Sequence, residues 1–330
     1  MEGLEIIMTF EKFYQHKTVL VTGGTGFIGS NLVKRLLEAG AQVRCIVRSG
    51  CSTWRLEKSK KLVLCEADLS KGTERVFSSA CRGVDIIFHL AAAGVHNQSA
   101  SLSECLKVNV AGTAILLEAA RKNNIKKFIS AGTCVEFGNV KHQGFITDST
   151  PVAPAGNYAV SKAAQTILTD LFLRSSNMQG FVLRLFYVYG PGELPPKFIP
   201  SLIKDALAGI PIRMTGGKQV RDFCFVDDIV SAFLRAGHCG RLANQPVILN
   251  IGSGRSLTLR QAAKMILALI PESDGISKHS LPYRVDEIWR LVPETRPASR
   301  LLSWQSQTSF NEGLKKTIIW FRQKGKFHAV

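Results

Sequence analysis

The sequence predicts an α/β fold with a doubly wound parallel sheet, followed by a smaller C-terminal α+β region. Between residues 17 and about 184, apolar runs rich in β-branched residues alternate with longer amphipathic stretches. A glycine-rich turn at 23–29 directly follows the first of these runs. After 190–192 the alternation gives way to short elements punctuated by prolines. Fully apolar strands separated by helices indicate a parallel sheet covered on both faces.

Length and composition are those of a globular chain. Its 330 residues can bury one large core or two modest ones, and 45% of them are hydrophobic. No apolar run reaches the roughly 18 residues that cross a bilayer. Glu2 and Glu5 stand ahead of the short N-terminal apolar patch, which argues against a signal peptide. The eight cysteines are scattered singly, so we expect a reduced, cytoplasmic protein without a metal site.

The formal net charge of +17 is the unusual bulk feature. Basic residues are spread along the chain rather than clustered in a tail or stripe, which disfavours nucleic acid as a partner. Attraction to a polyanionic small molecule, such as a dinucleotide or a nucleotide diphosphate, explains the same sign. A general bias towards lysine and arginine explains it equally well, so the charge alone decides nothing.

Hydrophobic periodicity places the elements. Strands are predicted at 18–22, 42–47, 62–65, 84–90, 127–131 and 181–185, and helices at 27–39, 102–123 and 158–175. Beyond 190, helices are predicted near 197–208, 226–237, 258–270 and 308–323. We therefore expect an N-terminal extension over 1–16, a first domain over 17–190, and a region over 191–330 that is interleaved with the last strands of the sheet.

The turn containing Gly23, Gly26 and Gly29 follows a strand and opens a helix. In that context glycines permit a tight turn, close approach of the backbone to a pyrophosphate, and close helix packing. Three glycines at this spacing are common, so the flanking strand and helix carry the interpretation. They favour a dinucleotide-binding turn over a purely structural one.

The end of the second strand bears on which dinucleotide is bound. Sites that prefer NAD usually place an acid there, whereas this chain has Arg48 and no carboxylate. A guanidinium suits a 2′-phosphate because it donates paired, charge-assisted hydrogen bonds. Unless Arg48 is simply a solvated strand end, the sequence predicts NADP(H) over NAD(H).

Tyr158 and Lys162 are four residues apart, which places both side chains on one face of a helix. There the ammonium can lower the tyrosine pKa from its ordinary value of about 10. Thr133 follows the fifth strand, where its hydroxyl could bind a substrate oxygen beside Tyr158. Each residue alone is unremarkable, since a lone threonine here is usually a turn residue. Together with the glycine turn they indicate proton transfer beside a nicotinamide.

These motifs resemble those of the extended short-chain dehydrogenase/reductase family, in its nucleotide-sugar branch. The resemblance covers nearly the whole chain, with matching segments at 22–29, 68–69, 89–92, 109–113, 133–138, 158–162, 183–192, 221–228 and 250–254. It implies an NAD(P)-binding Rossmann domain over 17–190 and a mainly substrate-binding region over 191–330. It also implies a nucleotide-diphosphate sugar as substrate.

The resemblance assigns roles to individual positions. Thr133 would bind the reacting oxygen, Tyr158 would be the acid or base, and Lys162 would bond the nicotinamide ribose. Phe198 would hold the nucleotide and Arg221 the diphosphate, with Tyr187 and Arg284 as further substrate residues. For His89 and Asn109 a structural role and a role near the cofactor are equally supported. The implied cofactor-binding residues are Gly23, Thr25, Gly26, Phe27, Ile28, Gly29, Arg48, Asp68, Leu69, Leu90, Ala91, Ala92, Asn109, Tyr158, Lys162 and Val188.

Two departures from the family pattern affect the substrate side. The family often has asparagine where Tyr187 stands, which puts the usual substrate-backbone contact in doubt. The segment 288–304 matches the family only loosely, and Arg284 and Arg290 are the candidate phosphate ligands in this part of the chain.

Three reactions share this machinery. Family dehydratases carry an extra acid and base directly after the active-site hydroxyl, and Cys134 and Val135 in those places argue against dehydration. A 4-epimerase usually retains NAD, whereas a simple reductase commonly consumes NADPH, so Arg48 favours the reductase. We therefore predict NADPH-dependent reduction of a nucleotide-linked 4-keto-6-deoxyhexose, with Tyr158 as general acid. An NAD-dependent 4-epimerase is the alternative.

Two further expectations concern class and assembly. A non-catalytic cofactor sensor or nucleic-acid binder with the same fold would use the positive charge, but the complete Thr133–Tyr158–Lys162 set argues against it. Family members commonly pair the helices that correspond to 102–123 and 158–175. A homodimer is therefore expected, although the apolar faces of these helices could instead pack internally.

Overall fold

The computed structural model describes residues 12–95, 99–140, 144–240, 246–277, 281–284 and 287–324. Most of the predicted N-terminal extension, residues 1–11, lies outside the described residues. The elements of the first region are β1 (Thr18–Thr22), α2 (Phe27–Glu38), β2 (Gln42–Val47), β3 (Leu62–Glu66), α3 (Glu74–Cys81), β4 (Ile86–His89), α4 (Leu102–Leu106), the π-helical turn η1 (Lys107–Gly112), α5 (Thr113–Lys122), β5 (Lys127–Thr133), the 3₁₀ turn η2 (Cys134–Phe137), α6 (Asn157–Arg174) and β6 (Gln179–Leu185).

The remaining elements follow β6. They are β7 (Tyr187–Tyr189), α7 (Phe198–Leu207), β8 (Val220–Arg221), β9 (Phe223–Phe225), α8 (Val226–His238), β10 (Val247–Ile251), β11 (Leu257–Thr258), α9 (Leu259–Ala268), β12 (Arg290–Leu291), α10 (Arg296–Leu302) and α11 (Phe310–Lys324).

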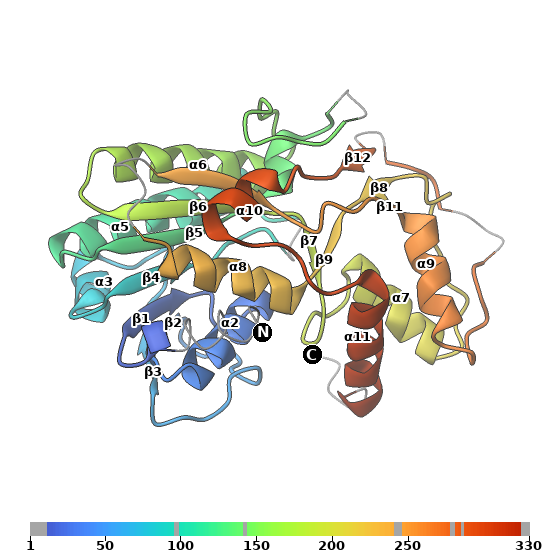
Figure 1. Ribbon diagram of the computed structural model, residues 1–330, viewed down its shortest axis with the longest axis horizontal. Helices are drawn as coiled ribbons and strands as arrows, with labels where there is room; N and C mark the ends of the chain where they lie inside the picture. Colours follow the sequence, from blue (N-terminus) through green and yellow to red (C-terminus); the bar gives the residue numbers. More distant parts are fainter. Residues whose placement is uncertain are drawn as a thin grey trace.

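A seven-stranded parallel sheet in the order β10-β6-β5-β4-β1-β2-β3 forms the centre of the molecule. This confirms the predicted doubly wound α/β fold. Helices α3, α5 and α6 cover one face, and α2 and α8 cover the other (Figure 1). Because the sheet is sandwiched, strand side chains alternate between two cores: Val19 and Val21 of β1 pack with α2, while Leu20 packs with α3 and α5.

The C-terminal half contributes to both parts of the molecule. β10 pairs with β6 at the edge of the large sheet, and α8 packs on the same sheet. The small sheets β11-β8-β12 and β7-β9, with α7, α9 and α11, lie beyond the carboxyl ends of the large sheet (Figure 1). Strand ends and this smaller region therefore face each other, which is where ligands bind in open α/β sheets.

The predicted long helix over 102–123 is interrupted. Its middle turn, η1, is π-helical and includes the fully buried Asn109. Single π-helical turns of this kind are frequent at functional sites. Within the described residues no helix is both long and apolar enough to cross a membrane.

Candidate active site

The glycine turn has the conformation predicted for a dinucleotide site. Gly23 has φ of +70°, and a Cβ there would lie 2.6 Å from the backbone nitrogen of Ala91. A Cβ at Gly29 would overlap the carbonyl oxygen of Gly23. Helix α2 begins at Phe27 without a side-chain cap, so the N–H groups of its first turn are available to an anion. Thr25, Gly26 and Ile28 belong to the same turn and first helical residues.

The ends of β2, β3 and β4 surround this turn. The exposed Arg48 follows β2 and lies near Asp68, which follows β3. Burial opposes ionisation of Asp68, but hydrogen bonds from Ser70 together with the Arg48 charge hold its pKa below the ordinary value. A cation and a carboxylate therefore share the predicted adenosine side of the site.

Two further groups of predicted cofactor residues lie near the same strand ends. Leu69 is buried beside Gly112, and Leu90, Ala91 and Ala92 are half-buried after β4.

His89 and Asn109 make buried hydrogen bonds with the protein. Burial lowers the pKa of His89 to about 3, and the neutral ring bridges the hydroxyls of Thr22 at 2.7 Å and Thr113 at 2.8 Å. The Asn109 amide bonds the backbone N–H and C=O of Ala93 and the hydroxyl of Ser161. His89 thus joins two hydroxyl side chains, whereas Asn109 fixes the backbone at Ala93, and both hydrogen atoms of its amide are used within the protein.

The three predicted catalytic residues lie together. Thr133 is the last residue of β5, and its hydroxyl hydrogen-bonds Tyr158 and lowers the tyrosine pKa. Tyr158 and Lys162 are one turn apart on α6. The Lys162 Nζ donates to the carbonyl oxygen of Ala131 at 2.7 Å and to Oε1 of Gln165 at 2.5 Å.

Burial dominates the electrostatics of this group. It raises the pKa of Tyr158 well above the ordinary value and lowers the pKa of Lys162 to about 8. The sequence predicted that the Lys162 charge would lower the tyrosine pKa. In the structure the hydrogen bond from Thr133 does this instead, because the ammonium is directed at Ala131 and Gln165.

The predicted substrate residues divide into two groups. Tyr187 is half-buried on β7, beside Val188, and the Arg221 guanidinium lies 5.2 Å above its ring. Phe198 stacks on Phe223 with ring centroids 6.2 Å apart. Arg284, in contrast, is exposed on the segment 281–284.

Arg221 has a partner that the sequence did not indicate. Its Nη2 lies 3.5 Å from Oε1 of Glu287, whose other oxygen accepts from Gln219 at 2.9 Å. Glu287 is 66 residues away along the chain and directly precedes the loosely matching segment 288–304, so no spacing pattern pointed to it. A diphosphate at Arg221 would have to share the guanidinium with this carboxylate.

Three more side chains near the strand ends were missed by sequence reasoning. Arg55, in the loop after β2, donates from Nε to Gly192 O at 3.0 Å and from Nη1 to Thr25 O at 3.4 Å. Lys197 donates to Val95 O at 2.9 Å, and burial raises the pKa of nearby Glu193 to about 8. All three lie in irregular segments, where no periodicity reveals which residues turn inward.

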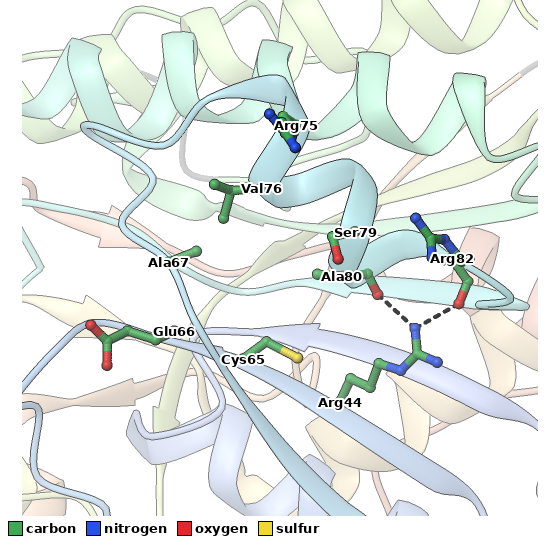
Figure 2. A pocket seen from close by; sticks show the side chains of 9 residues that line it. All are labelled: Arg44, Cys65, Glu66, Ala67, Arg75, Val76, Ser79, Ala80 and Arg82. Atoms are coloured by element: carbon green, nitrogen blue, oxygen red, sulfur yellow. Dashed lines mark hydrogen bonds between the residues drawn. The ribbon is translucent and has the colours of Figure 1, made fainter.

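A separate hollow of about 610 Å³ lies between β3 and α3, on the outer edge of the sheet (Figure 2). Arg44 spans it, donating to the carbonyl oxygens of Ala80 at 3.0 Å and Arg82 at 2.6 Å. None of its lining residues is one of the predicted site residues. This hollow is therefore separate from the predicted site at the strand ends.

Comparison with known proteins identifies the family of this chain. The model of the NAD dependent epimerase/dehydratase family matches residues 19–252, so the chain belongs to this family. That confirms the resemblance seen in the sequence and the predicted enzyme class, an oxidoreductase type that uses NAD(P).

Individual relatives catalyse several reactions. The trifunctional UDP-glucose 4,6-dehydratase/UDP-4-keto-6-deoxy-D-glucose 3,5-epimerase/UDP-4-keto-L-rhamnose-reductase RHM2 of Arabidopsis thaliana is 28% identical over 94% of this chain and 48% of its own length. The chain thus spans about half of that relative. UDP-glucose 4-epimerase of Mycolicibacterium smegmatis is 30% identical, over 93% of this chain and 99% of its own. The solved structure of MoeE5 in complex with UDP-glucuronic acid and NAD has a TM-score of 0.83 and 29% identity, over 93% of this chain and 99% of that one.

Proposed function

We propose that this protein reduces a nucleotide-diphosphate-linked 4-keto-6-deoxyhexose to the 4-hydroxy sugar with NADPH. The observation that carries the proposal is the hydrogen bond between Thr133 and Tyr158, one helical turn from Lys162. In this proposal the glycine turn holds the cofactor pyrophosphate and Arg221 the substrate diphosphate.

The reaction balances with these groups. NADPH, when bound at the glycine turn, would supply hydride with its two electrons to the C4 carbonyl carbon and would become NADP⁺. The Tyr158 hydroxyl gives its proton to the carbonyl oxygen, and the tyrosinate later regains a proton from solvent. A tyrosine whose pKa is raised by burial is protonated at neutral pH, as a general acid must be.

Dehydration is disfavoured because it needs a carboxylate facing the sugar. Cys134 and Val135 follow Thr133, and burial raises the Cys134 pKa to about 12. Glu136 is fully buried and both its oxygens accept hydrogen bonds from the protein. Within the described part of the chain, this segment therefore supplies no acid–base pair beyond Tyr158.

Epimerisation is the second candidate, favoured by the relative from Mycolicibacterium smegmatis. It requires the same tyrosine to act as base and then as acid while the cofactor is retained. The discriminating experiment supplies NADPH or NADH with CDP-, GDP-, dTDP- and UDP-linked 4-keto-6-deoxyhexoses and follows absorbance at 340 nm. Net oxidation of NADPH with one of them supports the reductase, whereas interconversion of nucleotide sugars without net oxidation supports the epimerase.

Arg48 supports NADPH as the cofactor. Replacing it by aspartate should exchange a phosphate-binding cation for a ribose-binding acid and shift the NADPH/NADH ratio of kcat/KM towards NADH by about 10–100-fold. Arg300→Asp, an equal charge change at an exposed position on α10, is the control and should leave the ratio unchanged. An unaltered ratio in Arg48→Asp would exclude Arg48 from cofactor choice.

We also propose a homodimer through α6. Val160, Ile167 and Leu171 lie on one face of this helix with 38%, 64% and 65% of their surfaces exposed. Ile167→Asp/Leu171→Asp should halve the sedimenting mass. Dimerisation would then bury two unpaired carboxylates on each protomer, and the cost of removing them from water would separate the protomers. Ile319→Asp, on the exposed face of α11, is the control. A wild-type protein that sediments as a monomer at high concentration would contradict the proposal.

A further inference from the structure

Glu136 is a fully buried carboxylate that takes no direct part in the proposed reaction. It lies on η2, directly after the strand that ends at Thr133. Its Oε1 accepts from the backbone N–H of Thr133 at 3.0 Å and from the Thr166 hydroxyl at 3.1 Å. Its Oε2 accepts from Nε of Arg184 at 3.0 Å. With both oxygens engaged, it cannot exchange a proton with substrate.

These contacts join the elements that carry the active site. Thr133 ends β5, Arg184 lies on the neighbouring β6, and Thr166 lies on α6. Thr166 follows Lys162 by four residues and Tyr158 by eight, so all three share one face of the helix. The contact is tight, because a Cβ added at Gly132 would lie 3.0 Å from Cγ of Arg184 and 3.2 Å from Oε1 of Glu136.

We propose that Glu136 is a positioning residue of this site, which ties the Thr133 end of β5 to the catalytic face of α6 and fixes a negative charge beneath Tyr158 and Lys162. The inference rests on the proposed function in assigning Tyr158 the part of a general acid. The link that Glu136 makes between β5, β6 and α6 does not depend on which sugar is reduced.

The direction of the charge effect agrees with reduction. The Glu136 carboxylate raises the pKa of Tyr158 and the pKa of Lys162. It therefore favours the protonated forms of both groups, and reduction begins from a protonated tyrosine. A buried charge acts strongly because little water screens it.

Other titratable groups face this cluster from every packed element. Arg184 comes from β6, Tyr158 and Lys162 from α6, and Cys134 from the same turn, where its raised pKa keeps the thiol neutral. Asp148, whose pKa is raised by burial, lies near Arg184, while Arg221 and Asp222 act on Cys134. His89, near Lys162, is neutral. Lys162, with a pKa of about 8, is therefore the group whose titration reports on Glu136.

The test follows Lys162 by NMR of the holoprotein carrying ¹³Cε-lysine, with the signal assigned by Lys162→Met. In Glu136→Gln the midpoint of its titration should fall by about one pH unit, because an attractive charge is lost. Glu136→Asp, which keeps the charge, should restore most of the shift. Asp228→Asn removes another buried, hydrogen-bonded carboxylate, on α8, and should leave the midpoint unchanged. An unchanged midpoint in folded Glu136→Gln would overturn the proposal.

A second variant guards against failure to fold. Glu136→Gln leaves the Arg184 guanidinium buried without its partner, so Glu136→Gln/Arg184→Met removes the pair together. Lys162 should still titrate lower there, because the attraction of the Glu136 carboxylate is lost. A wild-type midpoint in the double variant would refute the proposal. The NMR titration needs no substrate, so it is independent of the reductase assay. If the Lys162 midpoint falls in Glu136→Gln but the wild-type protein reduces none of the keto sugars, the proposed reaction is wrong and the role of Glu136 stands.

Discussion

Replacing Tyr158 by phenylalanine should lower turnover by about 10²–10⁴-fold while leaving NADPH binding intact. The variant removes the one hydroxyl that Thr133 bonds and that the proposed mechanism uses as proton donor. Since only the oxygen is lost, packing against Gly94 is preserved. Turnover is measured by the rate of NADPH oxidation, and binding is measured by the change in cofactor fluorescence on titration with protein.

Tyr14→Phe is the matched control for this variant. Tyr14 is also buried, and its hydroxyl donates to Leu234 O at 2.7 Å, on the opposite face of the sheet from α6. Loss of that hydroxyl should cost stability, about 1 kcal/mol, but not the chemistry. Near-normal turnover of Tyr158→Phe, or an equal loss in Tyr14→Phe, would show that the proton comes from elsewhere.

Gly29→Ala should disable cofactor binding. The added Cβ would overlap the carbonyl oxygen of Gly23, so the turn must open or α2 must shift. Overpacking of this kind costs about 1–3 kcal/mol, which corresponds to a loss of about 10–100-fold in NADPH affinity when the strain falls on the bound conformation. Fluorescence titration with NADPH measures the change, and thermal unfolding measures any loss of stability.

Gly240→Ala provides the comparison. A Cβ at Gly240 would meet nothing within 4 Å, so affinity and melting temperature should stay near those of the wild type. Wild-type NADPH affinity in Gly29→Ala would mean that the cofactor does not use this turn.

The large parallel sheet was predictable because its strands are buried on both faces and therefore read as continuous apolar runs. The strand predictions at 18–22 and 42–47 agree with β1 and β2. The helix α3 was missed because it is short, with eight residues of which half are polar. The strand β10 was missed because it pairs with β6 across a long stretch of sequence that holds β7, α7, β8, β9 and α8.

Some residues of the candidate site were likewise predictable from the sequence, and others were not. Thr133, Tyr158 and Lys162 were predictable because strand ends and a four-residue helical spacing fix their positions locally. Glu287 and Arg55 reach the site across long sequence separations, which no periodic pattern encodes. The effect of Lys162 on Tyr158 could not be predicted either, because it depends on where one flexible ammonium points, and here it points at Ala131 and Gln165.

Transfer of deuterium tests the central claim most directly. The protein is given NADPH deuterated at the transferred position and each nucleotide-linked 4-keto-6-deoxyhexose in turn, and the product is analysed by mass spectrometry and NMR. The account predicts one deuterium at C4 for every NADP⁺ formed, with the C4 keto group converted to a hydroxyl. A product without deuterium, formed with no net loss of NADPH, would contradict it.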